Sequence, residues 1–312
     1  MRRRLIGAGA LVIVLAVVVI VVGTSKSGPT APAGPPTLHA QTVLKVPAAS
    51  AVLQVGGRGF VTDDVNDRLL RFDSQGHTTG SLHLNGRPVA MVAFGDDLWV
   101  ANMVSNSVQE IGQSTLKVVR SISVPKGPSS LVVLDGRIFM TSITASSVSS
   151  INPRNGSLSA PVSLSAGAVR MAAGFGSLWV TGTSDQVTEL APSPVRPRQL
   201  EITVGQVPIG VAVGDGSVWV ANTGSGTVSR IDPASRRVEH LYRVGGAPLA
   251  VTVDQGTVWV ADGTGQTVRT IFPAPESRPL ELEATPRAFL GMGSDVWIAE
   301  SNPGGVVQVS PR

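Results

Sequence analysis

The chain of 312 residues contains no cysteine. Disulfide bonds, thiolate metal sites, a cysteine nucleophile and lipid modification of an N-terminal cysteine are therefore excluded, while the redox compartment stays open. Charged residues are few, at 15%, against about 25% in ordinary globular proteins. The sequence also lacks a phosphate-binding loop, a serine nucleophile elbow and zinc-ligand spacing. With 42% hydrophobic residues, the chain can bury a full-sized core, so disorder over its whole length is excluded.

An excess of positive charge is missing outside the N-terminus. The chain has 25 Lys and Arg against 21 Asp and Glu. Four of the basic residues, Arg2, Arg3, Arg4 and Lys26, lie within the first 36 residues, which leaves equal numbers of each sign in the remainder. Nucleic-acid binding needs a clustered basic face, so we expect no nucleic-acid partner.

The N-terminus has the pattern of a membrane segment. Residues 5–23 carry no charged or strongly polar side chain, and as a helix they approach the thickness of a bilayer core. The preceding arginines predict that residues 1–4 are cytoplasmic and that the bulk of the chain lies outside the cell membrane. The alternative is a cleaved signal peptide, whose apolar region is usually shorter. Residues 24–37, rich in Pro, Gly and Ser, predict a linker.

A repeat fills the rest of the chain. Its marker is an aromatic residue within a short apolar run, found at Phe60, Trp99, Phe139, Trp179, Trp219, Trp259 and Trp297. The spacings are 39, 40, 40, 40, 40 and 38 residues, close to the period of a four-stranded propeller blade, about 40 to 45 residues. Seven copies predict an all-β, seven-bladed β-propeller over residues 38–312. The aromatic side chains are expected to pack between adjacent blades.

A second column supports the register. The residue 11 positions before the aromatic is Pro in five copies and Ala in two: Pro88, Pro128, Pro208, Pro248, Pro286, Ala49 and Ala168. Each copy then resolves into four short strands. In the fifth copy these are 210–213, 218–221, 228–231 and 238–244, separated by Gly-rich and Asp-Pro turns.

The ends of the chain predict how the ring closes. The seventh copy stops after its third strand, residues 306–309, whereas a surplus strand, residues 39–46, precedes the first copy. We expect the N-terminal strand to complete the last blade, because an open sheet edge would invite aggregation.

At these residues the sequence resembles a known repeat. Trp-Val-Ala-Asn at Trp99 and Trp219, Trp-Val-Ala-Asp at Trp259 and the run 228–233 are similar to the repeat of YVTN and NHL-type bacterial propellers, which include the virginiamycin B (streptogramin) lyases. The resemblance covers residues 38–312. It implies a fold rather than an activity, since such propellers serve as lyases, as sensor domains of membrane kinases and as binding proteins.

A lyase of that family implies a His general base, and carboxylate and His ligands for Mg²⁺ near the propeller axis. In the predicted register His39, His83 and His240 fall on outermost strands, and His77 falls in a turn that leads to one. A general base must lie within hydrogen-bond reach of its substrate. We therefore assign no catalytic residue, metal site or cofactor.

Two further columns supply candidate binding residues. Three positions after the aromatic lie Asp63, Asn102, Ser142, Gly182, Asn222, Asp262 and Glu300, where second strands end and turns begin. Asp63, Asn102, Asn222, Asp262 and Glu300 are candidates for ligand binding, although Asp and Asn at such places commonly hydrogen-bond their own turn. The run Asp63, Asp64, Asn66 and Asp67 hints at Ca²⁺ but lacks the Gly and distal Glu of a calcium loop.

The innermost strands carry the second column. Two residues after the Pro position the copies read Ala51, Ala90, Ser130, Arg170, Gly210, Ala250 and Ala288. Arg170, with Arg87 and Arg287 on connections of other blades, predicts an anion-binding rim. The alternative is that Arg170 pairs with a carboxylate or fills the mouth of the channel with its aliphatic stem.

The sequence therefore predicts a single-pass membrane protein with an extracytoplasmic propeller that acts as a non-catalytic sensor or binding module for a protein, peptide or cell-envelope glycan. A streptogramin lyase-like enzyme and a purely structural scaffold are the alternatives.

Overall fold

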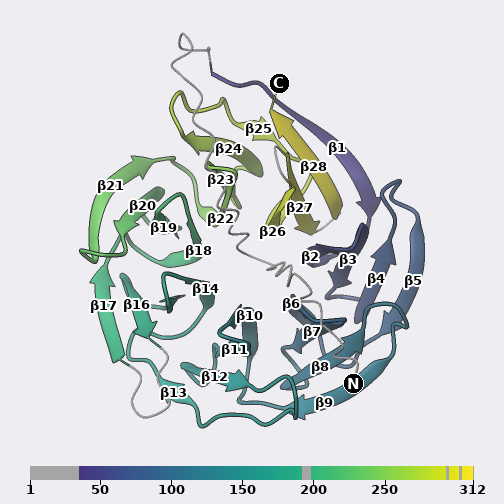
Figure 1. The fold of residues 1–312 in the computed structure, drawn as a ribbon. Helices are drawn as coiled ribbons and strands as arrows, with labels where there is room; N and C mark the ends of the chain where they lie inside the picture. Colours follow the sequence, from purple (N-terminus) through teal and green to yellow (C-terminus); the bar gives the residue numbers. More distant parts are fainter. Residues whose placement is uncertain (1–34, 192–197, 293–294, 302–303, 312) are drawn as a thin grey trace, which may run out of the picture.

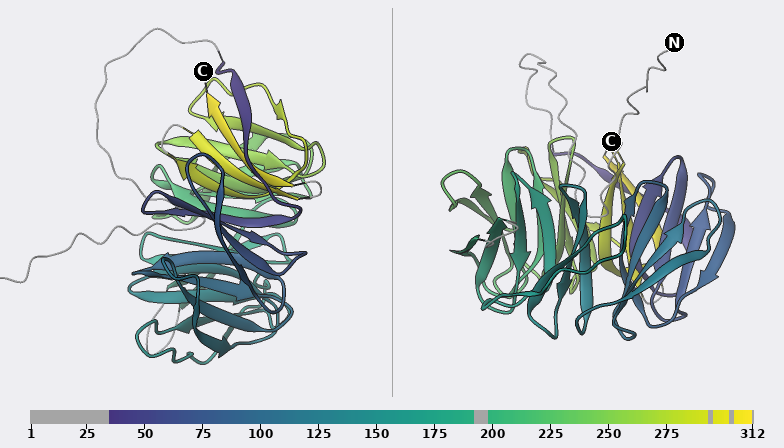
Figure 2. Two further views of the ribbon diagram at one scale, coloured as in Figure 1. Left: turned by 90° about the vertical axis from the view of Figure 1, so that its right-hand side faces the viewer. Right: turned by 60° about the horizontal axis from the view of Figure 1, so that its bottom comes forward.

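The computed structural model describes residues 35–191, 198–292, 295–301 and 304–311. They form seven four-stranded antiparallel sheets around a central axis (Figure 1). Turned on edge, the ring is a disc whose height is about that of one blade (Figure 2). The predicted all-β, seven-bladed β-propeller is thus confirmed.

Each blade runs from an innermost strand at the axis to an outermost strand at the rim. Blades 1 and 2 contain β2 (Ala49–Val55), β3 (Arg58–Asp63), β4 (Arg68–Phe72) and β5 (Thr78–His83), then β6 (Pro88–Phe94), β7 (Asp97–Asn102), β8 (Ser107–Gly112) and β9 (Val118–Ser123). Blades 3 and 4 contain β10 (Pro128–Leu134), β11 (Arg137–Ser142), β12 (Ser147–Ile151) and β13 (Val162–Ser163), then β14 (Arg170–Gly174), β15 (Ser177–Thr181), β16 (Gln186–Ala191) and β17 (Arg198–Thr203).

The last three blades follow the same order. Blades 5 and 6 contain β18 (Pro208–Gly214), β19 (Ser217–Asn222), β20 (Thr227–Asp232) and β21 (Arg237–Arg243), then β22 (Pro248–Asp254), β23 (Thr257–Asp262), β24 (Thr267–Phe272) and β25 (Leu280–Glu281). Blade 7 contains β26 (Thr285–Met292), β27 (Asp295–Ser301), β28 (Gly305–Pro311) and β1 (Leu38–Lys45).

The N-terminal strand closes the ring as predicted. β1 pairs antiparallel with β28, in a register that runs from Leu38 opposite Pro311 to Lys45 opposite Gly305. Blade 7 thereby combines the two ends of the described chain, and its edge strand comes from the start of the sequence (Figure 1).

The recurrent aromatic residues pack between blades. The indoles of Trp99, Trp179, Trp219 and Trp259 are fully buried. Trp219 of blade 5 lies 5.5 Å from Phe272 of blade 6, measured between ring centroids. Trp297 of blade 7 stacks on Phe72 of blade 1 at 5.4 Å. This confirms the prediction that the column stabilises blade stacking.

Arg230 joins blades 5 and 6 in the same way. Its guanidinium carbon lies 5.3 Å from the Trp219 ring and 5.1 Å from the Phe272 ring, and its Nε donates to Ser217 Oγ at 2.8 Å. We expect Arg230→Met to lower the free energy of unfolding by about 1 kcal/mol through loss of the cation–π contacts. Urea unfolding would measure it. Arg237→Met, on the exposed outermost strand, is the matched control, and equal losses in both variants would contradict the expectation.

The disc has two faces, which differ in the turns that they carry. We call the upper face the one that carries the turns between second and third strands and the connections between blades. The lower face carries the hairpins between first and second strands. β1 runs into the upper-face connection at residues 46–48, so it starts at the lower face. β28 is antiparallel to β1 and therefore ends at the lower face. Both ends of the described propeller therefore leave from the lower face.

The predicted cytoplasmic residues 1–4, the membrane segment 5–23 and most of the linker 24–37 lie outside the described residues. Within the described ranges, the model contains no helix of the length and hydropathy needed to cross a bilayer.

Candidate functional site

The innermost strands start with a β-bulge at the upper face. In six blades the pairing register shifts across the residue after the Pro or Ala position, for example between Pro286 and Ala288. Proline is tolerated there because the first residue of a strand need not donate to the ladder. A bulge re-aims the side chain of the extra residue. In blade 7 that residue is Arg287.

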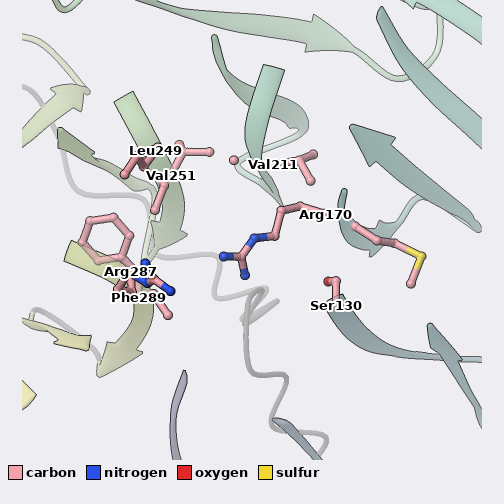
Figure 3. Close-up of a pocket in the computed structure, with 11 residues that line it drawn as sticks. Ser130, Arg170, Val211, Leu249, Val251, Arg287 and Phe289 are labelled. Atoms are coloured by element: carbon pink, nitrogen blue, oxygen red, sulfur yellow. The ribbon is translucent and has the colours of Figure 1, made fainter. Parts of the chain in front are cut away.

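Arg170 of blade 4 lies two residues after the Pro or Ala position of its innermost strand. The other blades carry Ala, Ser or Gly at this position. Arg170 is the first residue of β14 and pairs with Thr181. Small side chains in six blades leave open space at the axis, and the single long side chain extends into it. Figure 3 shows the Arg170 guanidinium reaching into the channel from one wall, with Arg287 on the opposite wall.

The channel forms a pocket around these two arginines. Its space of about 400 Å³ includes a part that is open to solvent, and it is lined by Ser130, Arg170, Met171, Gly210, Val211, Leu249, Ala250, Val251, Arg287, Ala288 and Phe289. A second pocket of about 330 Å³ reaches toward blades 1 and 2 and shares Ser130, Arg170, Ala288 and Phe289. We call the two together the axial pocket. Apart from Arg170, Arg287 and serine hydroxyls, its side chains are apolar, so a bound anion would find its polar partners in these groups.

The three arginines of the predicted rim differ in their partners. Asp64 Oδ2 lies 3.2 Å from Arg87 Nε and 3.7 Å from Arg287 Nη2, so one buried carboxylate serves two cations. Among the described residues, the Arg170 side chain has neither an ion pair nor a hydrogen bond. Removal from solvent and the nearby Arg287 charge both lower the pKa of Arg170, but a guanidinium stays protonated at physiological pH. The alternative of carboxylate pairing is therefore not what the structure shows.

Four of the five polar candidates are engaged in their own turns or blades. Asp63 accepts from the backbone and side chain of Asn66. Asp262 Oδ1 accepts from the backbone N–H groups of residues 247, 264 and 265. Asn102 donates to Gln109, and Asn222 donates to the hydroxyls of Thr227 and Ser229. These groups order the upper-face turns. None of the four is among the residues that line the axial pocket.

Glu300 differs from the other members of its column. It is 3% exposed, and within the described part of the chain its Oε1 has no hydrogen-bond partner, whereas the carboxylates of Asp63 and Asp262 accept from their own turns. Asn222, at the equivalent position, bonds Thr227 and Ser229, but the matching positions on β28 are Gly305 and Val307, which offer no hydroxyl. Burial first, and the carboxylate of Glu283 second, raise the pKa of Glu300 to about 7.

The histidines lie where the sequence places them. His39 is on β1, His83 on β5 and His240 on β21, all outermost strands, and His77 is in the turn before β5. None lines the axial pocket. Across the described part of the chain, no group of three or more His, Asp or Glu side chains is arranged to hold a metal ion.

Two features of the site were missed by sequence reasoning. Asp64 was considered only as part of a calcium-like run, whereas it is the shared counter-ion of Arg87 and Arg287. The apolar wall at Leu249 and Phe289 was also missed. The signal for Leu249 is present in the column after the Pro position, where the bulge lies. Phe289 follows Pro286 by three residues, at the position that Val251 occupies in blade 6.

Comparisons with known proteins show the fold alone. No protein-family model matches the sequence, and no curated protein does. A catalytically inactive virginiamycin B lyase from Staphylococcus aureus, crystallised with quinupristin, matches with a TM-score of 0.78 at 14% identity, over 88% of this chain and 99% of that one. The WD40 repeats of RRP9 match with a TM-score of 0.75 at 11% identity, over 88% and 97%. BBS1N, solved in complex with ARL6DN, matches with a TM-score of 0.71 at 13% identity, over 88% and 96%.

Proposed function

We propose that the chain is a membrane-anchored, extracytoplasmic propeller that binds a ligand or protein without catalysis, as a sensor or scaffold module, and that its axial pocket receives an anionic group of the partner. The observation that carries the proposal is Arg170, a cation in a largely apolar pocket with no acid partner among the described residues. Withdrawing a charge from water is unfavourable unless it is paired. An anion from a partner would supply the missing interaction.

The position of the chain ends supports binding away from the membrane. The sequence pattern of residues 5–23 is that of an uncleaved anchor, and the described chain leaves the propeller from its lower face. The upper face, with the axial pocket, would then point away from the bilayer. A linker of this length and composition spans on the order of 20 Å as a flexible chain, enough to free the disc from the lipid surface.

Propellers that bind proteins support the class of function. BBS1N was solved in complex with ARL6DN, and a protein, peptide or cell-envelope glycan is the partner class we propose. The streptogramin lyase alternative draws on the likeness to virginiamycin B lyase. It requires a general base at the axis, and the four histidines lie on the outer layer of the blades. An assay of streptogramin ring opening with and without chelator tests that alternative directly.

The proposed function is tested with the full chain immobilised in detergent and exposed to solubilised cell envelope. We expect a saturable partner to be retained by the wild type, released by excess acetylglutamate, and bound at least about tenfold more weakly by Arg170→Met, since a lost charged pair costs more than 1.4 kcal/mol. Arg237→Met on the rim should bind as the wild type does. Equal retention by Arg170→Met would remove the axial pocket from the proposal.

A further inference from the structure

Exposed aliphatic side chains mark equivalent turns of the first three blades. Val65 is 73% exposed, Val104 67% and Ile143 37%, each between the second and third strands on the upper face. Most of the other large exposed hydrophobic side chains in the described ranges lie on the outermost strands β9, β17 and β21. Val65 and Val104 follow the aromatic marker by five residues and Ile143 by four, so the three side chains share the turn rather than one position. A single exposed valine needs no explanation, but exposed aliphatic side chains in the same turn of three consecutive blades do.

The turns of blades 2 and 3 are held against the neighbouring connections. The backbone N–H of Val104 donates to Gly86 O at 2.9 Å, and that of Ile143 donates to Gly127 O at 2.8 Å. The residues next to these two acceptors in the sequence are the cations Arg87 and Lys126. We call residues 84–87, 103–106, 124–127, 143–146 and 164–169 the blade 2–3 sector.

The sector itself contains no acidic residue, although acids and bases are balanced over the propeller. Acids of neighbouring segments contact it at two points: Asp64 and Asp67 at Arg87, and Glu201 at Ser165. The sector ends at Arg170, which follows residue 169 and lines the axial pocket. The blade 1 turn is the opposite case, because Val65 is surrounded in sequence by Asp63, Asp64 and Asp67. Arg87 is already paired with Asp64, so the cations that remain for a partner are Lys126 and, at one end, Arg170. Together with the aliphatic side chains they complement an acidic chain that also carries aliphatic groups.

We propose that the blade 2–3 sector binds a polypeptide segment that combines aliphatic and acidic side chains, with one of its carboxylates in the axial pocket at Arg170. This rests on the proposed function and narrows its partner class to protein or peptide. A glycan presents hydroxyl groups, which gain little from Val104 and Ile143, whereas Leu or Val side chains gain by burying apolar area against them.

The test uses fluorescein-labelled octapeptides and the full chain in detergent, followed by fluorescence anisotropy at about 0.15 M salt so that unspecific charge attraction is screened. The probes are an alternating Leu-Glu peptide, a Ser-Glu peptide of equal charge and a Leu-Lys peptide of opposite charge. We expect saturable binding of the Leu-Glu peptide. The Ser-Glu peptide should bind about tenfold more weakly, since each aliphatic contact that it lacks contributes a fraction of a tenfold step in affinity. The Leu-Lys peptide should show no saturable binding, because its charge has the same sign as Lys126 and Arg170.

The variants separate the sector from the pocket. Val104→Ser/Ile143→Ser should weaken Leu-Glu by about tenfold and leave Ser-Glu unchanged, because only apolar contacts are lost. Val65→Ser, at the same turn position beside the Asp cluster, is the matched control and should bind as the wild type does. Arg170→Met should weaken both Glu peptides. Val65, Val104 and Ile143 are exposed, so their substitution should not disturb the core. A melting curve for each variant checks that it is folded.

Several outcomes would overturn the inference. These are absence of Leu-Glu binding up to about 1 mM, equal binding of Leu-Glu and Ser-Glu, equal binding of Leu-Lys, or a double variant indistinguishable from the Val65→Ser control. If the sector fails one of these tests but Arg170→Met still weakens binding of the Ser-Glu peptide, the proposed anion site survives without the sector. If Arg170→Met binds both Glu peptides normally, the proposed function fails at its own site.

Discussion

Deletion of residues 35–45 is expected to remove most of the stability of the propeller. β1 is the fourth strand of blade 7, and its side chains enter two apolar clusters. Leu38 is buried in the cluster between blades 6 and 7, whereas Val43 and Leu44 pack on the cluster between blades 7 and 1. Losing these contacts and the β1–β28 ladder should cost at least about 5 kcal/mol, comparable with the whole stability of many domains.

The comparison is between a chain that starts at residue 35 and one that starts at residue 46, so that both lack residues 1–34. Circular dichroism melting and light scattering would follow them. We expect the shorter chain to melt at lower temperature and to aggregate through the exposed edge of β28. A shorter chain that melts within a few degrees of the longer one would show that the ring does not depend on its closing strand.

A covalent version of the same experiment uses the absence of cysteine. His39 pairs with Ser310 across β1 and β28, and paired residues of antiparallel strands lie at Cα separations that suit a disulfide. Oxidised His39→Cys/Ser310→Cys should be more stable than its reduced form by up to about 5 kcal/mol, because the bond closes nearly the whole chain into a loop. Ala40→Cys/Ser310→Cys places the two thiols on opposite faces of the sheet and should not crosslink.

The fold could be predicted from the sequence because its determinants repeat. The aromatic and Pro columns recur at one period, so each copy confirms the register of the others, and a missing strand at one end has only one surplus strand to fill it. Trp219, for example, is buried at the interface between blades 5 and 6, as expected for a residue of the recurrent aromatic column. Such information is local to one repeat and is read without knowing which blades touch.

The site depends on contacts between side chains of different blades, and these contacts could not be predicted from the sequence. Arg87, Arg170 and Arg287 look alike as members of a rim. Only the structure shows that Asp64 of blade 1 pairs with Arg87 and Arg287, while Arg170 has no acid partner among the described residues. The bulge at Arg287 could not be predicted either, because the residues that flank the prolines of the column differ from blade to blade and show no common signal for it.

Glu300→Gln is expected to abolish a pH dependence of stability. Burial and Glu283 raise the pKa of Glu300 from 4.5 to about 7 in the folded chain. Between these two pH values the folded state binds a proton that the unfolded state has lost, so the free energy of unfolding falls as the pH rises. The total loss above pH 7 is about 3 kcal/mol. At pH 8 the Gln variant should therefore melt higher than the wild type by about 5 °C or more, and at pH 4.5 the two should coincide.

The neighbouring acids test whether this pH dependence belongs to Glu300. Glu283→Gln removes the like charge and should recover part of the stability lost at pH 8, while Glu281→Gln, exposed on β25, should change nothing. A wild type whose melting temperature is constant from pH 5 to 8 would contradict the raised pKa. A slope that persists in Glu300→Gln would assign it to another group. Because Gln keeps the size of Glu, a loss of the slope without a loss of fold isolates the ionisation of Glu300 as its cause.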